Sequence, residues 1–115
     1  MSPRARPAPA AQATPSAQLI ESASETAAEL LKAMANPQRL RVLCLLVERE
    51  MSVGEINALV PLSQSALSQH LAVLREKNLV STRREAQTVY YSVADGTVHD
   101  VIEVLHRNLC SPSAD

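Results

Sequence analysis

Two cysteines are the side chains best suited to covalent chemistry in this sequence of 115 residues. Cys44 lies within the apolar run "RLRVLCLLVERE", and Cys110 lies five residues before the last residue. A single cysteine on a core helix is most often a small buried apolar side chain. The residues by themselves therefore leave two interpretations of Cys44 open: a buried hydrophobic residue, or one half of a reactive pair.

Uncharged polar side chains gather in the segment "SQSALSQHLAVLREKN". When Leu67, Leu71 and Leu74 of this predicted helix face the core, its opposite face presents amides and hydroxyls, whereas a merely solvated face would more usually carry Glu and Lys. Such groups can read base edges in the major groove of DNA. The alternative is a polar surface that lacks charge by chance. The predicted DNA-reading residues are Ser63, Gln64, Ser65, Ser68, Gln69 and His70, the last of which could equally be a packing residue.

Two adjacent arginines, Arg83 and Arg84, precede a predicted turn, and Gln87 and Thr88 follow it. The net charge of the chain is −1, but four of the six charged residues between Ser63 and Val93 are basic. A local basic face suits contacts with DNA phosphates. Two solvated arginines on an exposed strand are the alternative. We predict that these four residues also bind DNA.

The elements that must position these groups are five helices and a hairpin. Apolar residues at steps of three and four predict helices over residues 16–35, 37–49, 53–60, 64–77 and 97–110. "SVGE" at residues 52–55 fits a capping box, and Asn78 followed by Leu79 fits a Schellman stop. "LVSTRR" and "TVYYSV" predict the two strands of a hairpin. The predicted fold is mainly α with a small β-hairpin, a winged helix-turn-helix, with the helix pair and the hairpin side by side in the chain.

The predicted domain organisation is simple. Residues 16–110 form one DNA-binding and dimerisation domain. Residues 1–15, rich in Pro and Ala, are predicted to be a disordered tail, and residues 111–115 a frayed C-terminus.

Other classes of protein find little support in the sequence. The two glycines, Gly54 and Gly96, form no phosphate-cradling loop, and no cluster of carboxylates accompanies a histidine, so we expect no enzyme and no cofactor. A helical adaptor that binds only protein would not need a polar face beside paired arginines. Four prolines interrupt the first 15 residues, and no apolar run approaches the roughly 18 residues of a membrane span. We therefore expect a cytoplasmic protein, with no membrane partner, whose thiols rest reduced.

The sequence resembles a known family of regulators. "ELLKAMANPQRLRVLCLL", "SVGEINALVPLSQSALSQHLAVLREKNLVSTRREAQTVYYSV" and a closing helix that ends in Cys resemble ArsR/SmtB-type repressors, from about Glu25 to Cys110. Within that family the sequence is most similar to the metal-free BigR, SqrR and HlyU group. The resemblance implies a dimeric winged-helix transcription factor whose first and last helices form the subunit interface. It also implies that Cys44 and Cys110 work as a dithiol.

A metal-responsive regulator is the alternative within the same family. The arsenic sensors carry a Cys-x-Cys pair where this chain has "MSVGE", and the zinc sensors place Asp and His two residues apart on the last helix. Here His99 and His106 lie seven residues apart, too far to share a metal within one chain, although two histidines from each of two subunits could do so. We predict no metal site. A DNA-binding regulator without a thiol switch is the remaining alternative.

The predicted switch depends on the last helix packing beside the second. Cys44 and Cys110 would then come within bridging reach, about 5.5 Å between α-carbons. Cys110 should be the more exposed thiol and should react first, with Arg107 and His106 nearby to favour its thiolate. An oxidant or, as the resemblance suggests, a persulfide or polysulfide would modify Cys110. Cys44 would then resolve the adduct into a bridge that favours release of DNA.

Apolar stripes on the first and last predicted helices indicate self-association, because one small domain cannot cover both. We predict a symmetric homodimer that binds double-stranded DNA at an imperfect palindromic operator. The predicted interface consists of Leu19, Ile20, Ala23, Ala27, Val101, Ile102, Leu105 and Leu109.

Overall fold

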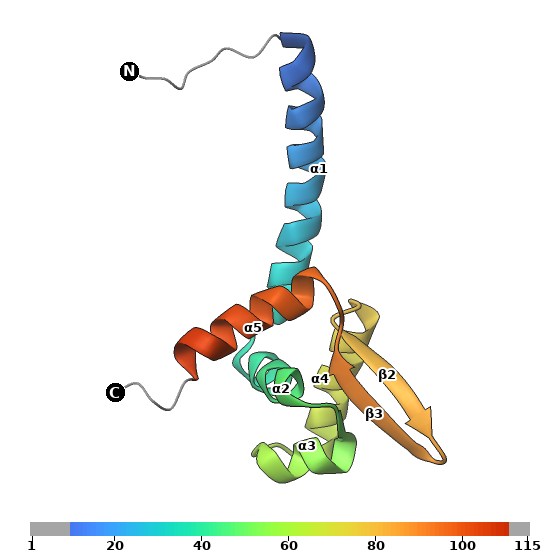
Figure 1. Cartoon of the computed structure of the whole chain (residues 1–115). Helices are drawn as coiled ribbons and strands as arrows, with labels where there is room; N and C mark the ends of the chain where they lie inside the picture. Colours follow the sequence, from blue (N-terminus) through green and yellow to red (C-terminus); the bar gives the residue numbers. More distant parts are fainter. Residues whose placement is uncertain (1–9, 111–115) are drawn as a thin grey trace. The chain divides into compact units, whose positions relative to one another are not determined.

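The computed structural model describes residues 10–110, and residues 1–9 and 111–115 lie outside the described part. The elements follow in the order α1 (Ala10–Met34), α2 (Pro37–Glu48), β1 (Met51–Ser52), α3 (Val53–Leu59), α4 (Gln64–Glu76), β2 (Val80–Glu85), β3 (Thr88–Val93) and α5 (Thr97–Leu109) (Figure 1). This confirms the predicted class, mainly helical with a small antiparallel hairpin. The chain divides into two units, Met1–Leu31 and Lys32–Asp115, and each is described by itself.

The first unit contains most of α1. The helix begins at Ala10, whereas the sequence predicted a helix from residue 16 and a tail over residues 1–15. The division of the chain into tail and domain stays a prediction. Alanine has the highest helix propensity, and the Ala-rich stretch before Pro15 extends the helix toward the N-terminus. The rest of the predicted tail, residues 1–9, lies outside the described residues, as does the predicted frayed end at 111–115.

The second unit holds the core. Asn36 caps α2, because its side-chain oxygen accepts hydrogen bonds from the backbone N–H groups of Gln38 (2.9 Å) and Arg39 (3.0 Å), and Pro37 occupies the first turn. Apolar side chains from every helix and strand of this unit meet around α2. The largest fully buried ones are Leu43, Met51, Ile56, Leu67, Leu74, Leu79, Ile102 and Val42.

The start of the helix-turn-helix, α3, is fixed by the predicted capping box. The Ser52 hydroxyl accepts from the Glu55 backbone N–H (3.2 Å), and the Glu55 carboxylate accepts from the Ser52 backbone N–H (2.9 Å). The turn between α3 and α4 is held by Asn57, whose side-chain amide donates to the Leu62 carbonyl (2.8 Å). These local bonds set the angle at which α4 leaves the turn.

The end of α4 is the predicted Schellman stop. Asn78 adopts a left-handed backbone (φ 62°), and the Leu79 N–H donates to the Leu74 carbonyl (2.8 Å). The Asn78 N–H donates to the Arg75 carbonyl (3.1 Å). Leu79 is fully buried, so the stop also turns the chain into β2 with an apolar anchor.

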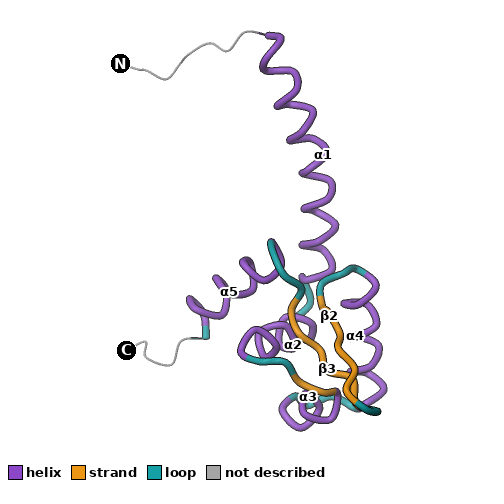
Figure 2. The backbone as a smooth tube through the Cα atoms, turned by 45° about the vertical axis from the view of Figure 1, so that its right-hand side comes forward, coloured by secondary structure: helices purple, strands orange, loops and turns teal. Residues whose placement is uncertain are grey.

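The sheet has three strands in the order β1-β3-β2, all antiparallel (Figure 2). The two-stranded hairpin is confirmed, but the sequence missed β1, in which Met51 pairs with Tyr91 and Ser52 with Tyr90. On β3, Tyr91 and Val93 share one face of the sheet with the buried Met51, because side chains alternate along a strand. This face is turned toward the core, and the opposite face is turned away from it.

Among the described helices, none is long and apolar enough to cross a membrane. Within the second unit, α2 packs against α5, α4 and β3.

Candidate nucleic-acid interface and dithiol site

The outward face of α4 carries most of the residues that the sequence selected for DNA. Gln64, Ser65, Ser68 and Gln69 are exposed, while Leu67 is fully buried on the opposite side of the helix. The structure therefore brings four predicted contact residues together on one open surface of the helix. Their role as DNA contacts stays a prediction.

Two further predicted residues of this helix are placed differently. Ser63 is the N-cap of α4, and its hydroxyl accepts from the Ala66 N–H (3.1 Å) and lies 3.4 Å from the Ser65 hydroxyl. The hydroxyl of Ser63 thus supports the helix end as well as lying beside the polar face. His70 is half-buried, whereas the four residues of the polar face are exposed.

The two arginines of the hairpin lie on opposite faces of the sheet. Arg83 pairs in register with Tyr90, and its guanidinium lies 4.8 Å from the centre of that ring. It also donates to the carboxylates of Glu50 (3.1 Å from Nε) and Glu85 (3.0 Å). The hydrogen bond from Arg83 lowers the pKa of the Glu50 carboxyl. The charge of Arg83 is therefore balanced within its own chain.

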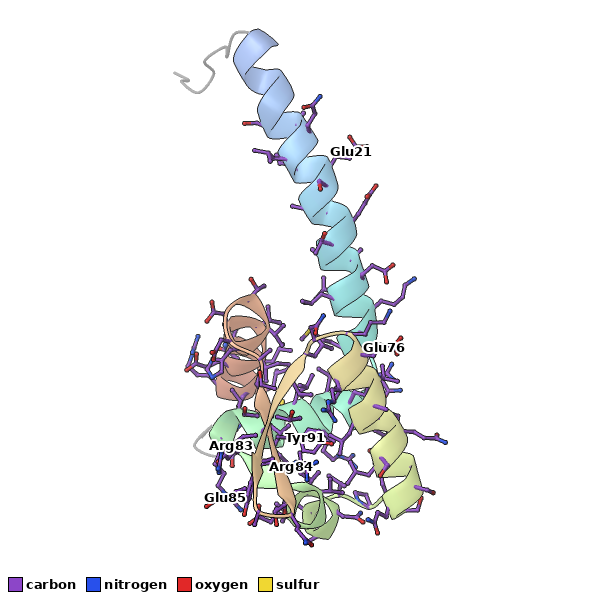
Figure 3. The ribbon with its side chains drawn as sticks, turned by 90° about the vertical axis from the view of Figure 1, so that its right-hand side faces the viewer. Glu21, Glu76, Arg83, Arg84, Glu85 and Tyr91 are labelled. Atoms are coloured by element: carbon purple, nitrogen blue, oxygen red, sulfur yellow. The ribbon has the colours of Figure 1, made fainter. Side chains whose placement is uncertain are left out.

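Arg84 occupies the other face of the hairpin, together with Val89 and Tyr91. Figure 3 shows Arg84 and Tyr91 on the side of the hairpin toward α4, and Arg83 and Glu85 on the other side. Arg84 is exposed and, among the described residues, forms no ion pair. Gln87 and Thr88 are exposed at the tip beside it.

A surface hollow of about 380 Å³ lies between α4 and β3. Ser68, Arg75, Glu76 and Tyr91 line it together with apolar side chains of α3 and α4. Sequence reasoning did not select Arg75 or Tyr91. Ser68 and Arg75 are seven residues apart, a spacing that places them on one helical face, but nothing local pointed to Tyr91 opposite them.

The two cysteines meet on another side of the second unit. Cys44 on α2 is half-buried and Cys110 at the end of α5 is exposed, and both thiols are free. They line one surface hollow of about 340 Å³, together with Leu40, Arg41, Leu45, Glu48 and His106. Burial raises the pKa of the Cys44 thiol, and the adjacent Cys110 thiol and the Glu48 carboxylate raise it further. Cys110 is thus the more accessible of two neighbouring thiols.

His106 has a partner that the sequence did not predict. Its Nε2 lies 2.7 Å from a carboxylate oxygen of Glu48, and this pair joins α5 to α2. We expected His106 to support the thiolate of Cys110; its Nε2 lies against Glu48, and an effect on Cys110 stays a prediction. The expectation came from spacing on α5 alone, and a partner 58 residues away in the chain carries no local signal.

The predicted interface residues of α5 do not form one stripe. Ile102 is fully buried in the core of a single subunit, so it cannot contribute an exposed surface. Val101 and Leu105 are half-buried and line a shallow apolar hollow with Val104, which is 47% exposed and was missed. Helical spacing placed Ile102 beside Val101 and Leu105, but it could not tell which edge of the stripe turns toward α2.

The end of α5 and the middle of α1 carry further exposed apolar side chains. Leu109 is 77% exposed at the last turn of α5. On α1, described by itself, Leu19, Ile20, Ala23 and Ala27 are all exposed. Their contact with a second subunit stays a prediction.

One group of possible metal ligands occurs among the described residues. His99, Asp100 and Glu103 offer ligand atoms that all lie within 4.8 Å of one another on the first turns of α5. His99 Nδ1 lies 3.9 Å from a Glu103 oxygen, one turn further along α5. His106 does not join the group, because it contacts Glu48.

The comparisons with known proteins find bacterial transcriptional regulators. The family model described as "Bacterial regulatory protein, arsR family" matches residues 36–82. The transcriptional activator HlyU of Vibrio cholerae is 55% identical over 93 residues, which are 81% of this chain and 86% of HlyU. The solved structure of reduced HlyU from the same species has a TM-score of 0.77 at 54% identity and covers 82% of this chain and 99% of that chain. The transcriptional repressor BigR of Xylella fastidiosa has a TM-score of 0.77 at 34% identity, covering 85% of this chain and 97% of that chain.

Proposed function

Because this chain belongs to the arsR family of bacterial regulatory proteins, and is a DNA-binding transcriptional regulator rather than an enzyme, we propose that its thiols Cys44 and Cys110 control its affinity for DNA. The observation that carries the proposal is the shared hollow in which an exposed and a half-buried thiol lie next to each other. Two coincidentally placed structural cysteines would not need a common solvent-open site.

The effector is an oxidant, a persulfide or a polysulfide. The exposed Cys110 reacts first, and Cys44 then closes an intrachain bridge, in keeping with the raised pKa of the half-buried thiol. A persulfide R–S–SH supplies the oxidising equivalents: Cys110 takes its outer sulfur and releases R–SH, and Cys44 displaces that sulfur as H₂S and leaves a disulfide. One of the similar solved structures is that of reduced HlyU, and this supports a redox interpretation here.

The DNA-bound form is a homodimer that places two α4 helices in successive major grooves of an imperfect palindrome. Support comes from the exposed polar face of α4 and from exposed apolar side chains on α1 and α5, including Leu19, Ile20, Val104 and Leu109. Gln64, Ser65, Ser68 and Gln69 read bases, and Arg84 contacts a phosphate.

The test measures covalent state and DNA affinity on the same samples. Wild type, Cys44→Ser and Cys110→Ser are treated with polysulfide or peroxide, then divided between mass spectrometry and a fluorescence-anisotropy titration with the promoter duplex. We expect wild type alone to form the Cys44 to Cys110 linkage and to lose operator affinity, about 5- to 150-fold for an ordinary allosteric coupling. Linkage without loss of affinity, or no linkage, contradicts the proposal.

A metal-responsive regulator is tested by the same titration. The motivating observation is the group of His99, Asp100 and Glu103 on α5. If zinc shifts DNA affinity in a way that His99→Gln abolishes, while the thiol reagents have no effect, the metal alternative replaces the thiol switch.

A further inference from the structure

Two pairs of side chains cross the gap between α2 and α5 inside the dithiol hollow. On α2, Cys44 and Glu48 are four residues apart and therefore lie on the same face of the helix. His106 and Cys110 on α5 are also four residues apart and share one face. The thiols form one pair, and Glu48 with His106 (2.7 Å) forms the other, one helical turn away. The hydrogen-bonded pair of Glu48 and His106 therefore lies directly beside the position of the proposed bridge.

We propose that Glu48 and His106 are positioning residues for bridge closure: His106 holds the Glu48 carboxylate and offsets its charge, so that Cys44 can act as a thiolate. This inference rests on the proposed dithiol switch and assigns a role to two residues of the same site. Because a carboxylate can only accept, the His106 Nε2 is the donor in this hydrogen bond.

The electrostatics of the hollow give the two residues opposite effects. Burial raises the pKa of the Cys44 thiol most, and the Cys110 thiol and then the Glu48 carboxylate raise it further. A donor on that carboxylate draws its charge away from the thiol and keeps the side chain turned toward α5. The other charged group lining the hollow is Arg41, whose guanidinium donates to the Gln38 side chain (3.1 Å) and stays the same in every variant considered below.

Bridge closure can be isolated with a neutral disulfide, 2,2′-dithiodipyridine. The Cys110 thiolate attacks the reagent, forms a mixed disulfide and releases one pyridine-2-thione. Cys44 then attacks the Cys110 sulfur of that mixed disulfide and releases the second pyridine-2-thione, so two thiols and one disulfide give one protein disulfide and two thiones. With one equivalent of reagent per chain, which Cys110 consumes in the first step, the second release reports closure directly, and Cys44→Ser should release only one equivalent. A neutral reagent keeps changes in charge at Glu48 from acting on the reagent itself.

The variants separate charge from mere structure. Glu48→Gln should move the midpoint of the pH–rate profile for the second release to lower pH, and below that midpoint closure should be about two- to fivefold faster. His106→Leu should move the midpoint to higher pH and slow closure by a similar factor, and His106→Gln, which keeps an amide donor, should restore most of the rate. Glu103→Gln, an exposed carboxylate on α5 outside the hollow, is the matched control and should leave the profile unchanged.

The outcomes distinguish this inference from the proposed function. If wild type releases a single equivalent, the dithiol does not close and the proposed switch fails together with the inference. If wild type releases two equivalents but Glu48→Gln and His106→Leu slow closure alike, the pair only aligns the helices and the charge-balancing role is overturned. Since Glu48→Gln replaces an exposed group with one of the same shape, an unchanged midpoint in that variant alone also overturns it.

Discussion

Arg83 and Arg84, the two neighbouring arginines of the β2-β3 hairpin, should differ in their effect on the salt dependence of DNA binding, although they carry equal charge. Arg83 donates to Glu50 and Glu85, so its charge is already neutralised within the chain. Arg84 projects from the face shared with Tyr91 and forms no ion pair within the described part of the chain, so we expect it to contact a phosphate. Replacing each by glutamine removes one positive charge from adjacent positions, so each variant is the control for the other.

The expected magnitude follows from counterion release. Each phosphate neutralised contributes about 0.9 to the slope of log K against log salt, so a dimer with two wings should lose about 1.8 from the slope in Arg84→Gln. Between 50 and 200 mM salt, the advantage of wild type over this variant should then shrink about 12-fold. Arg83→Gln should leave the slope within error of wild type.

The assay is a fluorescence-anisotropy titration of operator and unrelated duplexes at five salt concentrations. Arg84→Gln should weaken binding to both duplexes equally, because phosphate contacts carry no sequence information. If Arg83→Gln flattens the slope as much as Arg84→Gln, the intrachain pairing of Arg83 does not govern its availability, and the assignment of the two faces is wrong.

Four further predictions concern α4, α5 and the turn between β2 and β3. Gln69→Ala should cost about 1–3 kcal/mol on the operator and little on unrelated DNA, measured by the same anisotropy titration. Ile102→Ala should lower the free energy of unfolding by about 2–5 kcal/mol in urea denaturation, because Ile102 is fully buried. Leu105→Glu should instead yield monomers in analytical sedimentation. A wild-type protein that is a stable monomer at micromolar concentration contradicts the predicted role of Leu105 in the dimer. Ala86, which has a left-handed backbone (φ 56°), should be improved by Ala86→Gly, with a gain in urea denaturation of up to about 1 kcal/mol and no change in DNA affinity.

The sequence predicted those features that are fixed by hydrogen bonds between residues close together in the chain. The capping box at Ser52 and the stop at Asn78 involve residues three to five apart, and both were found with the predicted partners. The strand β1 was missed because two residues show no alternation, and its partner residues, Tyr91 and Tyr90, lie 40 and 38 residues further along the chain. The pairing of β1 with β3 depends on how distant segments of the chain pack, and no local pattern of residues predicts it.

For the candidate site too, local patterns predicted some features and packing determined the others. Periodicity predicted which side of α4 is polar, and alternation along β2 requires that Arg83 and Arg84 point oppositely. Which of the two arginines faces α4 depended on how the sheet packs, and that was not evident from the residues. Likewise, helical spacing placed His106 and Cys110 on one face of α5, but the Glu48 that binds His106 could be identified only once α2 lay beside that face.

The packing of α2 indicates how the proposed bridge between Cys44 and Cys110 would affect the predicted DNA-binding surface on α4 and the hairpin. This helix contacts α5, which carries Cys110, and also contacts α4 and β3, which carry the polar face and the wing. Its side chains Val42, Leu43 and Leu46 are buried, and close-packed interiors move as units rather than deforming smoothly. The proposed bond between Cys44 and Cys110 would fix α5 against α2, and only those arrangements of α4 and the hairpin that suit the bridged helix pair would remain favourable. The bridge can alter DNA affinity only by the difference in its own stability between the two arrangements. An identical reduction potential for the dithiol in free and DNA-bound protein would therefore exclude this coupling, whatever the chemistry of the effector.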